Sequence, residues 1–209
     1  MDGEIGQELM KDLEGTGVIG INYWENGFRH LTNNVKEVKS VDDIKGLKIR
    51  TLENKLHIDL WKELGANPVP MAFTELFTAL EQGVVDGQEN PVGNVAANKM
   101  YEVQKYITKT GHVYNASPFL ISEKFWKTLS SEEQEIIKKA AEEAKEYQRQ
   151  LNAEEDEKLF KEIEKEGMVV TELTDEQKQA FIDKVQPIYK KYGKEFGEDL
   201  VAKLLEAGK

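Results

Sequence analysis

The feature that most constrains this fold is a long segment, residues 131–166, that contains neither glycine nor proline. The segment is rich in Ala, Glu, Lys and Gln, which are strong helix formers. Ser130 and Glu133 have the spacing of a capping box, so a helix is expected to begin there. A single helix of this length must cross from one lobe of the protein to another or lie along both.

Before this helix, short apolar strands alternate with helices. Strands are predicted over residues 18–24, 47–52, 84–88 and 112–121, and helices over residues 4–13, 56–64, 73–82 and about 90–106. Asn26-Gly27 is predicted to form a turn. A strand over residues 168–173 and a helical C-terminus, interrupted by Pro187, Gly193 and Gly197, complete the chain. The alternation is typical of α/β units on a largely parallel sheet.

The acidic composition excludes several classes of partner. The chain has 39 Asp and Glu against 28 Lys and Arg, a formal net charge of -11. Nucleic acids and anionic membrane surfaces both require clustered positive charge, so neither is an expected partner. A small anion can still bind where a few arginines converge, because a pocket has its own local potential.

Cysteine and long apolar segments are both absent from the sequence. Without cysteine there are no disulfides, thiolate metal sites or Cys nucleophiles. No apolar run is long enough to span a bilayer. The opening residues, 1–5, lack the charged and apolar regions of a signal peptide, so none is expected in this chain.

Catalytic and metal-binding motifs have little support in the sequence. Three imidazoles, His30, His57 and His112, are the candidate bases, but none stands in a nucleophile-elbow motif, and a structural role is favoured for each. Residues 86–90, Asp-Gly-Gln-Glu-Asn, resemble part of a calcium loop but lack its later bidentate Glu. No catalytic residue, metal or cofactor is therefore predicted.

Arg50 stands out because it lies within an apolar strand, between Ile49 and Thr51. A parallel strand is usually covered on both faces, so its guanidinium is expected to be partly buried and to need a partner. That partner is either an internal carboxylate or an anionic ligand held in bidentate geometry. Arg29, just after the predicted turn, raises the same question.

Several segments in series are similar to those of the DctP-type TRAP solute-binding proteins, a family of transport receptors. Taken singly each motif is weak, but their order and spacing cover nearly the whole chain. The matching segments are Glu25-Asn26-Gly27-Phe28-Arg29, Gly46-Leu47-Lys48-Ile49-Arg50, Pro70-Met71-Ala72-Phe73, Asp86-Gly87-Gln88-Glu89-Asn90-Pro91, Tyr101-Glu102-Val103-Gln104-Lys105-Tyr106 and Gly111-His112-Val113-Tyr114.

The resemblance implies an α/β fold of the type II periplasmic-binding-protein kind, with two lobes and a long helix that spans both. It assigns residues 27–114 and 155–209 to lobe II, and residues 1–26 and 115–154 to lobe I, the latter stretch holding a strand and the long connecting helix. The opening third of the family's fold, with most of the first lobe, has no counterpart here. The fold is therefore expected to be N-terminally truncated.

The resemblance also implies the binding residues. The family's main carboxylate-binding arginine falls on Arg50, and a second ligand-contacting arginine falls on Arg29. Asn90 matches an amide that donates to the carboxylate, and Phe73 matches an aromatic residue of the pocket, for which core packing is the alternative. The sequence departs from the family at Leu52-Glu53-Asn54, where a proline is expected. Glu53 and Asn54 are therefore candidate ligand-specific contacts, with an exposed Glu53 as the alternative.

The function implied by the resemblance is a non-enzymatic receptor that captures a C4-dicarboxylate or sugar acid for the membrane permease subunits of a TRAP transporter. The expected location is the periplasm. Because one wall of the family's binding cleft has no counterpart, two alternatives stay open. One is a fragment that binds ligand weakly and self-associates through uncovered strands, and the other is an enzyme acting on small carboxylates.

Overall fold

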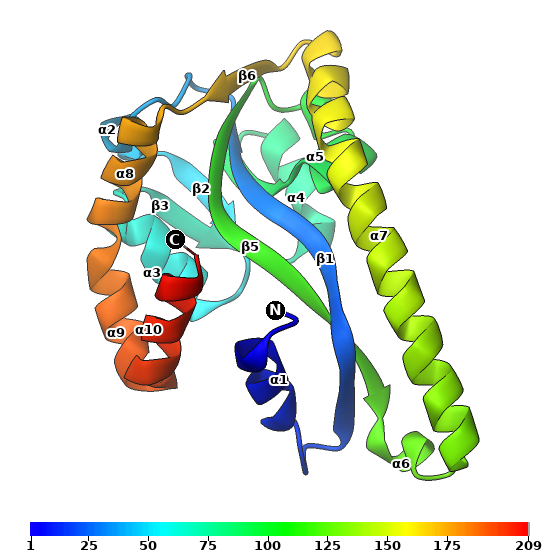
Figure 1. The fold of residues 1–209 in the computed structure, drawn as a ribbon. Coiled ribbons are helices and arrows are strands. Elements are labelled where there is room, and N and C mark those ends of the chain that lie inside the picture. Colours follow the sequence, from blue (N-terminus) through cyan, green and yellow to red (C-terminus); the bar gives the residue numbers. More distant parts are fainter. Residues whose placement is uncertain (209) are drawn as a thin grey trace. The chain divides into compact units, whose positions relative to one another are not determined.

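The computed structural model describes residues 1–208, and these contain a six-stranded sheet and helices that connect its strands (Figure 1). The strands lie in the order β3-β2-β4-β1-β5-β6. Their bounds are β1 Val18–Asn33, β2 Lys48–Thr51, β3 Asn67–Pro70, β4 Gly87–Pro91, β5 Tyr106–Ser122 and β6 Val169–Glu172. The β2 strand pairs in parallel with β3 and β4, and β5 with β6, whereas β1 is antiparallel to β4. The predicted α/β class is confirmed.

The helices connect these strands in the alternation that the sequence predicts. Those before the long helix are α1 Glu4–Lys11, α2 Val41–Ile44, α3 Lys55–Glu63, α4 Phe73–Glu81, α5 Val92–Ala97, the 3-10 turn η1 Met100–Glu102 and α6 Glu123–Trp126. The long helix and those after it are α7 Ser131–Lys165, α8 Asp175–Lys184, α9 Gln186–Phe196 and α10 Glu198–Ala207. None of the helices within residues 1–208 is long and apolar enough to cross a membrane.

The chain divides into two compact units. Unit 1 comprises Met1–Gly27 and Tyr114–Asp156, and unit 2 comprises Phe28–Val113 and Glu157–Lys209. The β1 and β5 strands and the α7 helix each run from one unit into the other. The identification of these units with the two lobes of the family stays a prediction.

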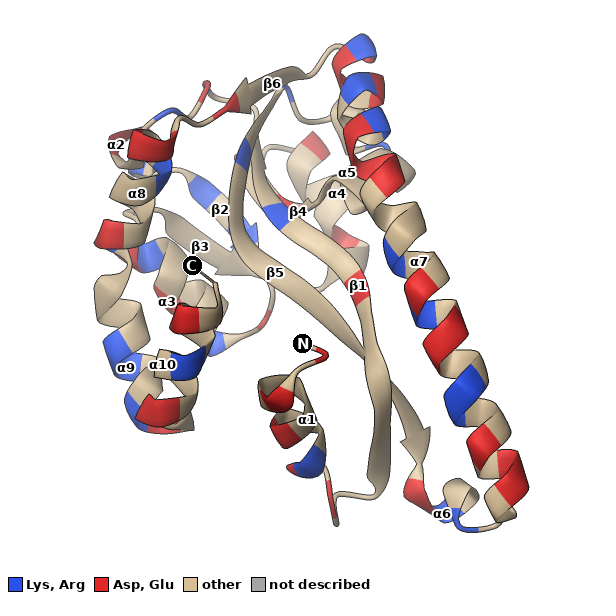
Figure 2. Cartoon of the chain, in the orientation of Figure 1, with Lys and Arg blue, Asp and Glu red and all other residues tan. Residues whose placement is uncertain are grey.

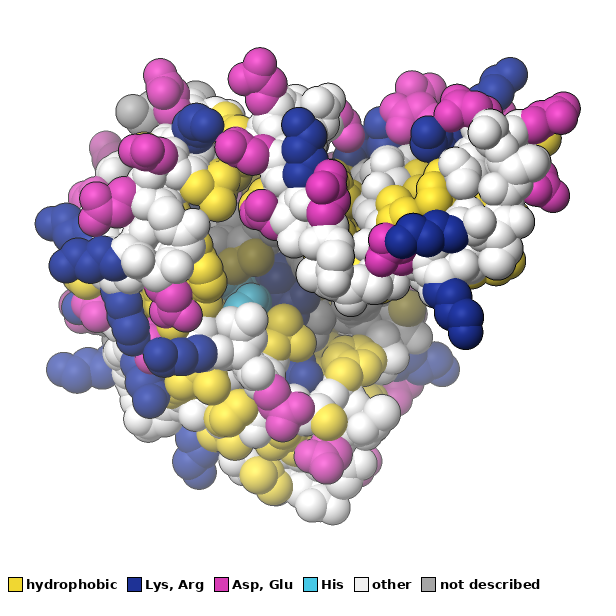
Figure 3. Space-filling view, turned by 90° about the horizontal axis from the view of Figure 1, so that it is seen from below, with side chains coloured by type: hydrophobic (Ala, Val, Ile, Leu, Met, Phe, Trp, Pro, Cys, Tyr) yellow, Lys and Arg dark blue, Asp and Glu magenta, His cyan; other side chains and the backbone are white. Residues whose placement is uncertain are grey.

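The long α7 helix confirms the prediction from the glycine- and proline-free segment. Its capping box is formed, because the Glu133 N–H donates to Ser130 Oγ at 3.2 Å and the Ser130 N–H donates to Glu133 Oε2 at 2.7 Å. Acidic and basic residues succeed one another along the helix (Figure 2). They are also interspersed over the molecular face in Figure 3, as the composition leads one to expect.

Two local predictions are wrong. Asn26-Gly27 does not form a turn but lies inside β1, where Gly27 adopts a φ of 97° that only glycine adopts without strain, so the strand continues past it. The predicted helix to residue 106 ends at Ala97, because Lys99 has a left-handed φ of 50°, and β5 already begins at Tyr106.

The C-terminal glycines also differ from expectation. Gly193 does not interrupt the helix but is buried within α9, where a Cβ atom would make ordinary van der Waals contact with Glu198 and Val201 of α10. The break falls at Gly197 alone, which has a φ of 111°. Pro187 is accommodated in the first turn of α9, where no backbone donor is needed.

Two hydrophobic clusters of unit 2 pack against the sheet. One joins Ile49 of β2 and Leu31 of β1 to Trp61 of α3 and to Ile188 of α9. The other is built from α4, α5, the C-terminal part of α7 and β5. Its fully buried members include Leu76, Val95, Ile107 and Ile163. Because both clusters contain strand and helix residues, the central strands are enclosed, and polar groups on them must find partners inside the protein.

Gly87 occupies a position where β4 and β1 approach too closely for a side chain. A Cβ atom there would lie 2.1 Å from the carbonyl oxygen of Thr32. We expect Gly87→Ala to destabilise the chain by about 2 kcal/mol or more, since the strands must separate to admit a methyl group. Gly93→Ala is the matched control, because a Cβ there meets only Leu159 at 3.9 Å. Urea unfolding with equal midpoints for the two variants would contradict this account.

Candidate functional site

The predicted binding residues come together at one edge of the sheet in unit 2. Arg50 lies in β2 and pairs with Gln88 of β4, and Arg29 of β1 pairs with Pro91 of β4. Because β2 and β4 run in parallel, their carboxyl ends meet at this edge, and the antiparallel β1 brings Arg29 to the same place. The crevice outside the carboxyl ends of parallel strands is where ligands of α/β proteins usually bind.

Arg29 is fully paired inside the protein. Its Nε donates to Glu89 Oε2 at 2.6 Å and its Nη2 donates to Glu89 Oε1 at 2.9 Å, the two-point geometry in which guanidinium and carboxylate bind most strongly. Nη2 also donates to Asn90 Oδ1 at 3.0 Å. The side chains of Arg29 and Glu89 are 3% and 0% exposed, so this ion pair is removed from water.

Glu89 holds a group of donors together. Its Oε2 is 3.0 Å from Nε2 of His112, and its Oε1 is 3.8 Å from Nδ1 of His57. Burial tends to raise the pKa of the Glu89 carboxyl, but the hydrogen bonds of His112 and Arg29 outweigh it and hold the pKa at about 2. Glu89 is therefore ionised at neutral pH. Burial lowers the pKa of His57, although the charge of Glu89 opposes that effect.

Arg50 differs from Arg29 because its charge is not neutralised. Its side chain is 1% exposed, and its Nε and Nη2 both donate to the carbonyl oxygen of Met71, at 3.0 and 2.8 Å. Nη1 is buried without a hydrogen-bond partner, and no carboxylate among residues 1–208 forms an ion pair with Arg50. Burial lowers the pKa of Arg50, which reflects the cost of holding an unpaired cation away from water.

Asn90 and Phe73 lie beside the arginines. Asn90 is 3% exposed, and its Oδ1 accepts from Arg29 and from Asn94 Nδ2, so its amide nitrogen points elsewhere. The Phe73 ring at the start of α4 is 41% exposed, and its centroid is 5.9 Å from the Arg50 guanidinium carbon. Phe73 is therefore not packed in the core, which was the alternative to a pocket role.

Asn54 and Glu53 have different surroundings. Asn54 is the N-cap of α3, and its side chain accepts from the backbone N–H groups of Leu56 and His57, at 2.8 and 3.4 Å. This local role explains an asparagine there without a ligand. Glu53 is exposed, which agrees with the alternative to a ligand contact. Its charge nevertheless acts to raise the pKa of Arg50. The ligand contacts predicted for all six residues stay predictions.

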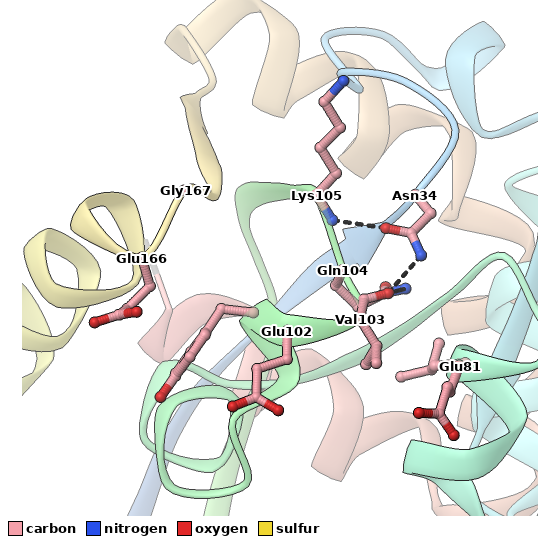
Figure 4. Close-up of a pocket in the computed structure, with 10 residues that line it drawn as sticks. Asn34, Glu81, Glu102, Val103, Gln104, Lys105, Glu166 and Gly167 are labelled. Carbon is pink, nitrogen blue, oxygen red and sulfur yellow. Dashed lines mark hydrogen bonds between the residues drawn. The ribbon is translucent and has the colours of Figure 1, made fainter.

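Unit 2 also has a surface depression that none of the predicted binding residues lines. It is lined by polar groups, with Glu81, Glu102 and Glu166 around it and Lys105 beside Asn34 (Figure 4). Three carboxylates would repel an anionic ligand. This depression is therefore not the site at the sheet edge.

Sequence reasoning missed three residues of the site, Glu89, His57 and His112. Glu89 stands in a segment that carries the family resemblance, and its adjacency to Asn90 on a buried strand was the available signal. The sequence favours a structural role for the two histidines, and nothing in it places either imidazole against Glu89.

The family follows from the sequence match. Residues 1–195 match the family of bacterial extracellular solute-binding proteins, family 7, also called DctP. The chain belongs to this family. Curated relatives include a solute-binding protein of Verminephrobacter eiseniae, which is 39% identical over 99% of this chain and 61% of its own length. The 2,3-diketo-L-gulonate-binding periplasmic protein YiaO of Escherichia coli is 40% identical over 88% of this chain and 55% of its own.

A further relative is the C4-dicarboxylate-binding protein DctB of Bacillus subtilis, which is 36% identical over 100% of this chain and 60% of its own length. The chain thus spans about 60% of the length of these relatives. Its relatives are receptors of the TRAP type that bind organic acids, among them dicarboxylates and sugar acids.

Solved structures agree with this assignment. A TRAP periplasmic solute-binding protein from Ochrobactrum anthropi, with a C-terminus bound in its ligand-binding pocket, is 51% identical and superposes with a TM-score of 0.91 over 99% of this chain and 64% of that one. One from Polaromonas sp. JS666, bound to D-erythronate, is 42% identical with a TM-score of 0.92, over 97% and 66%. The sugar acid binding protein DctPAm from Advenella mimigardefordensis, with galactonate, is 41% identical with a TM-score of 0.93, over 99% and 66%.

The Arg29–Glu89 pair yields a stability prediction. We expect Glu89→Gln to destabilise the chain by about 3 kcal/mol, because it leaves the Arg29 charge buried without a counter-charge. The double variant Arg29→Met, Glu89→Leu should recover part of that loss, because both charges are gone. Urea unfolding of the three variants measures this, and a double variant no more stable than Glu89→Gln would count against the pair.

His30 predicts how stability depends on pH. Burial lowers its pKa from 6.5 to about 3, and the charges of His112 and Lys109 act in the same direction. Between these two values the unfolded chain takes up a proton that the folded chain does not, so stability falls as pH falls through this range. The contribution is up to about 1.4 kcal/mol per pH unit.

The matched variant is His30→Asn, because an asparagine oxygen can replace Nδ1 as acceptor of the Gly111 N–H. We expect the loss of unfolding free energy between about pH 7 and about pH 5 to be smaller in this variant than in the wild type. Equal losses would show that His30 is not held neutral.

Proposed function

We propose that this chain is a receptor that binds one small organic acid anion, with the ligand carboxylate on the guanidinium of Arg50. The observation that carries this proposal is the state of Arg50, which is buried, donates to a backbone carbonyl alone among the described residues and has Nη1 without a partner there. A buried cation is stabilised by an anion that also accepts its hydrogen bonds, and a carboxylate does both.

The charges of the site fit one carboxylate. Arg29 and Glu89 neutralise each other, which leaves the single positive charge of Arg50 to be matched by a ligand. A carboxylate has two oxygens, so one can accept from Nη1 while the other takes a neighbouring donor. Arg29 acts mainly by fixing Glu89 and Asn90 beside the ligand.

The ligands named for the relatives support a carboxylate anchor. D-erythronate, galactonate, 2,3-diketo-L-gulonate, a C4-dicarboxylate and a polypeptide C-terminus have different bodies. Their common group is a carboxylate. A site that recognises this group through one arginine, and the rest of the ligand through variable neighbours, accounts for that range.

The remaining predicted residues take supporting roles in this proposal. Asn90 has a second amide N–H beyond the one that it donates inside the protein, and this donor is available for the carboxylate. Phe73 packs its ring against the guanidinium and covers the apolar side of the ligand. Glu53, which is exposed and close enough to act on Arg50, and Asn54 beside it are candidate contacts for ligand hydroxyls.

The family membership extends the proposal to location and partners. We propose that the chain acts outside the cytoplasmic membrane, delivers its ligand to the membrane permease subunits of a TRAP transporter, and performs no chemistry on the ligand. Support comes from the family, which consists of extracellular solute-binding proteins.

A second candidate, self-association without useful ligand binding, is favoured by one observation. Unit 1 has large exposed apolar side chains on β5 and α6, namely Phe119, Leu120 and Phe125, which are 40%, 41% and 52% exposed. Exposed apolar patches favour association. Gel filtration separates the two, because self-association predicts a species larger than a monomer that organic acids do not change.

Arg50→Met tests the proposed anchor. The melting temperature is measured with succinate, D-erythronate and galactonate in turn. We expect at least one of these acids to raise the melting temperature of the wild-type chain. The variant should lose this response, with an affinity reduced about a hundredfold or more, since a charge-assisted pair is removed. Without ligand the variant should be as stable as the wild type or more stable, because an unpaired buried charge has gone.

Arg29→Met is the matched control for that variant, because it removes an arginine that has its own carboxylate. We expect it to be clearly destabilised without any ligand. The proposal fails if no acid stabilises the wild type, or if Arg50→Met binds as well as the wild type does.

A further inference from the structure

A chain of buried side-chain amides and a hydroxyl runs from the binding site into the sheet of unit 2. It consists of Asn90, Gln88, Thr32 and Gln104, which we call the relay. All four residues are at most 3% exposed. Asn90 Nδ2 donates to Gln88 Oε1, Gln88 Nε2 donates to Thr32 Oγ1 at 2.9 Å, and Thr32 Oγ1 donates to Gln104 Oε1 at 2.8 Å. Thr32 stands directly opposite Gln88 in the pairing of β1 with β4.

The direction of every hydrogen bond in the relay is fixed at both ends. At one end Gln104 Nε2 donates to the backbone carbonyls of Val103 and Asp86, at 3.0 and 3.4 Å, and a carbonyl can only accept. At the other end Asn90 Oδ1 accepts from Arg29, and a guanidinium can only donate. A reversed amide anywhere in the relay would place two donors or two acceptors together.

This fixed direction determines what Asn90 presents to the binding site. Because its Oδ1 is held by Arg29 and one of its N–H groups by Gln88, the second N–H is the group left for a ligand. An N–H donor suits a carboxylate, whereas a flipped amide would present an oxygen and repel it. The relay therefore keeps an N–H donor of the Asn90 amide, and not its oxygen, directed to an anionic ligand.

We propose that Thr32 is a positioning residue for ligand binding, and that it acts through Gln88 to hold the Asn90 amide in its donor orientation. The inference rests on the proposed function, since it assumes that Asn90 donates to the bound carboxylate. Thr32 is suited to this role because one hydroxyl both donates and accepts a hydrogen bond. Since it donates to Gln104, it must accept from Gln88, which fixes the orientation of the Gln88 amide. Thr32 itself makes no contact with Arg50 or Arg29 in this network.

A simpler explanation is that the relay only satisfies the hydrogen bonds of buried polar groups. A comparison with Thr108 distinguishes this explanation from a positioning role. Thr108 is also fully buried, in the neighbouring strand β5, and its hydroxyl donates to the carbonyl of Val38 at 3.0 Å. Thr108→Val removes a buried hydroxyl of the same kind without touching the relay. Thr32→Val removes the hydroxyl that joins Gln88 to Gln104.

The experiment uses the whole chain with ¹⁵N-labelled asparagine. The side-chain amide signal of Asn90 is assigned by its absence from Asn90→Ser. In Thr32→Val we expect this signal to shift and its hydrogen exchange to become about tenfold faster or more, because Gln88 is free to turn. Thr108→Val should leave the signal unchanged, and Thr32→Ser should restore it.

Affinity for the acid that best stabilises the wild type is the second measurement. We expect Thr32→Val to bind it about tenfold more weakly or worse, with Thr108→Val and Thr32→Ser near the wild type. If Thr32→Val does not fold, Gln104→Met replaces it, because it frees the Thr32 hydroxyl from the other end of the relay. An Asn90 signal that is the same in Thr32→Val or Gln104→Met as in the wild type overturns the inference.

The two proposals fail in different ways. If no acid binds the wild type but the Asn90 signal responds to Thr32→Val and not to Thr108→Val, the receptor function is wrong and the positioning role of Thr32 stands. If an acid binds and Thr32→Val binds it equally well, the positioning role is wrong and the receptor function stands.

Discussion

Glu89 has no exposed surface, and the arrangement of the site depends on how its negative charge is stabilised. A carboxylate without water must be surrounded by donors, and the fold supplies them from separate strands: Arg29 from β1 and His112 from β5. The imidazole of His57 on α3 lies nearby, with its Nδ1 3.8 Å from Glu89 Oε1. These contacts join strands that lie far apart in the sequence. They also use up the charge of Arg29, which leaves Arg50 as the cation without a counter-charge.

The order of the strands explains why Arg29 and Arg50 have different partners. The β4 strand lies between β2 and β1, so its side chains can meet those of both. Glu89 pairs with the arginine from β1, whereas the guanidinium of Arg50 on β2 donates to the carbonyl of Met71 and lies beside the Phe73 ring. Under the proposed function this difference matters, because a cation that is fully paired inside the protein has little to gain from a ligand.

Much of the fold could be predicted from local patterns. The α7 helix follows from helix formers and a capping box, and the strand at Arg50 follows from its apolar neighbours, because both depend on residues close in sequence. Predictions failed at glycines whose backbone conformation depends on the surrounding tertiary structure rather than on neighbouring residues in the sequence. Gly27 continues a strand rather than forming a turn, and Gly193 lies inside α9 rather than ending a helix. In the candidate site, the sequence points to Arg50, Arg29 and Asn90, whose ligand contacts stay predictions, and it does not point to Glu89 or the two histidines.

The sequence by itself determined the α/β class, the long helix, the family resemblance and the presence of an arginine in an apolar strand. These depend on periodicity, capping and motif order, which are properties of neighbouring residues. Only the tertiary structure decided which arginine is neutralised, since that depends on where Glu89 lies once β1 and β4 have paired. It likewise decided that the Asn90 amide is joined to Thr32 through Gln88, because hydrogen bonds between distant strands exist only after the sheet has formed.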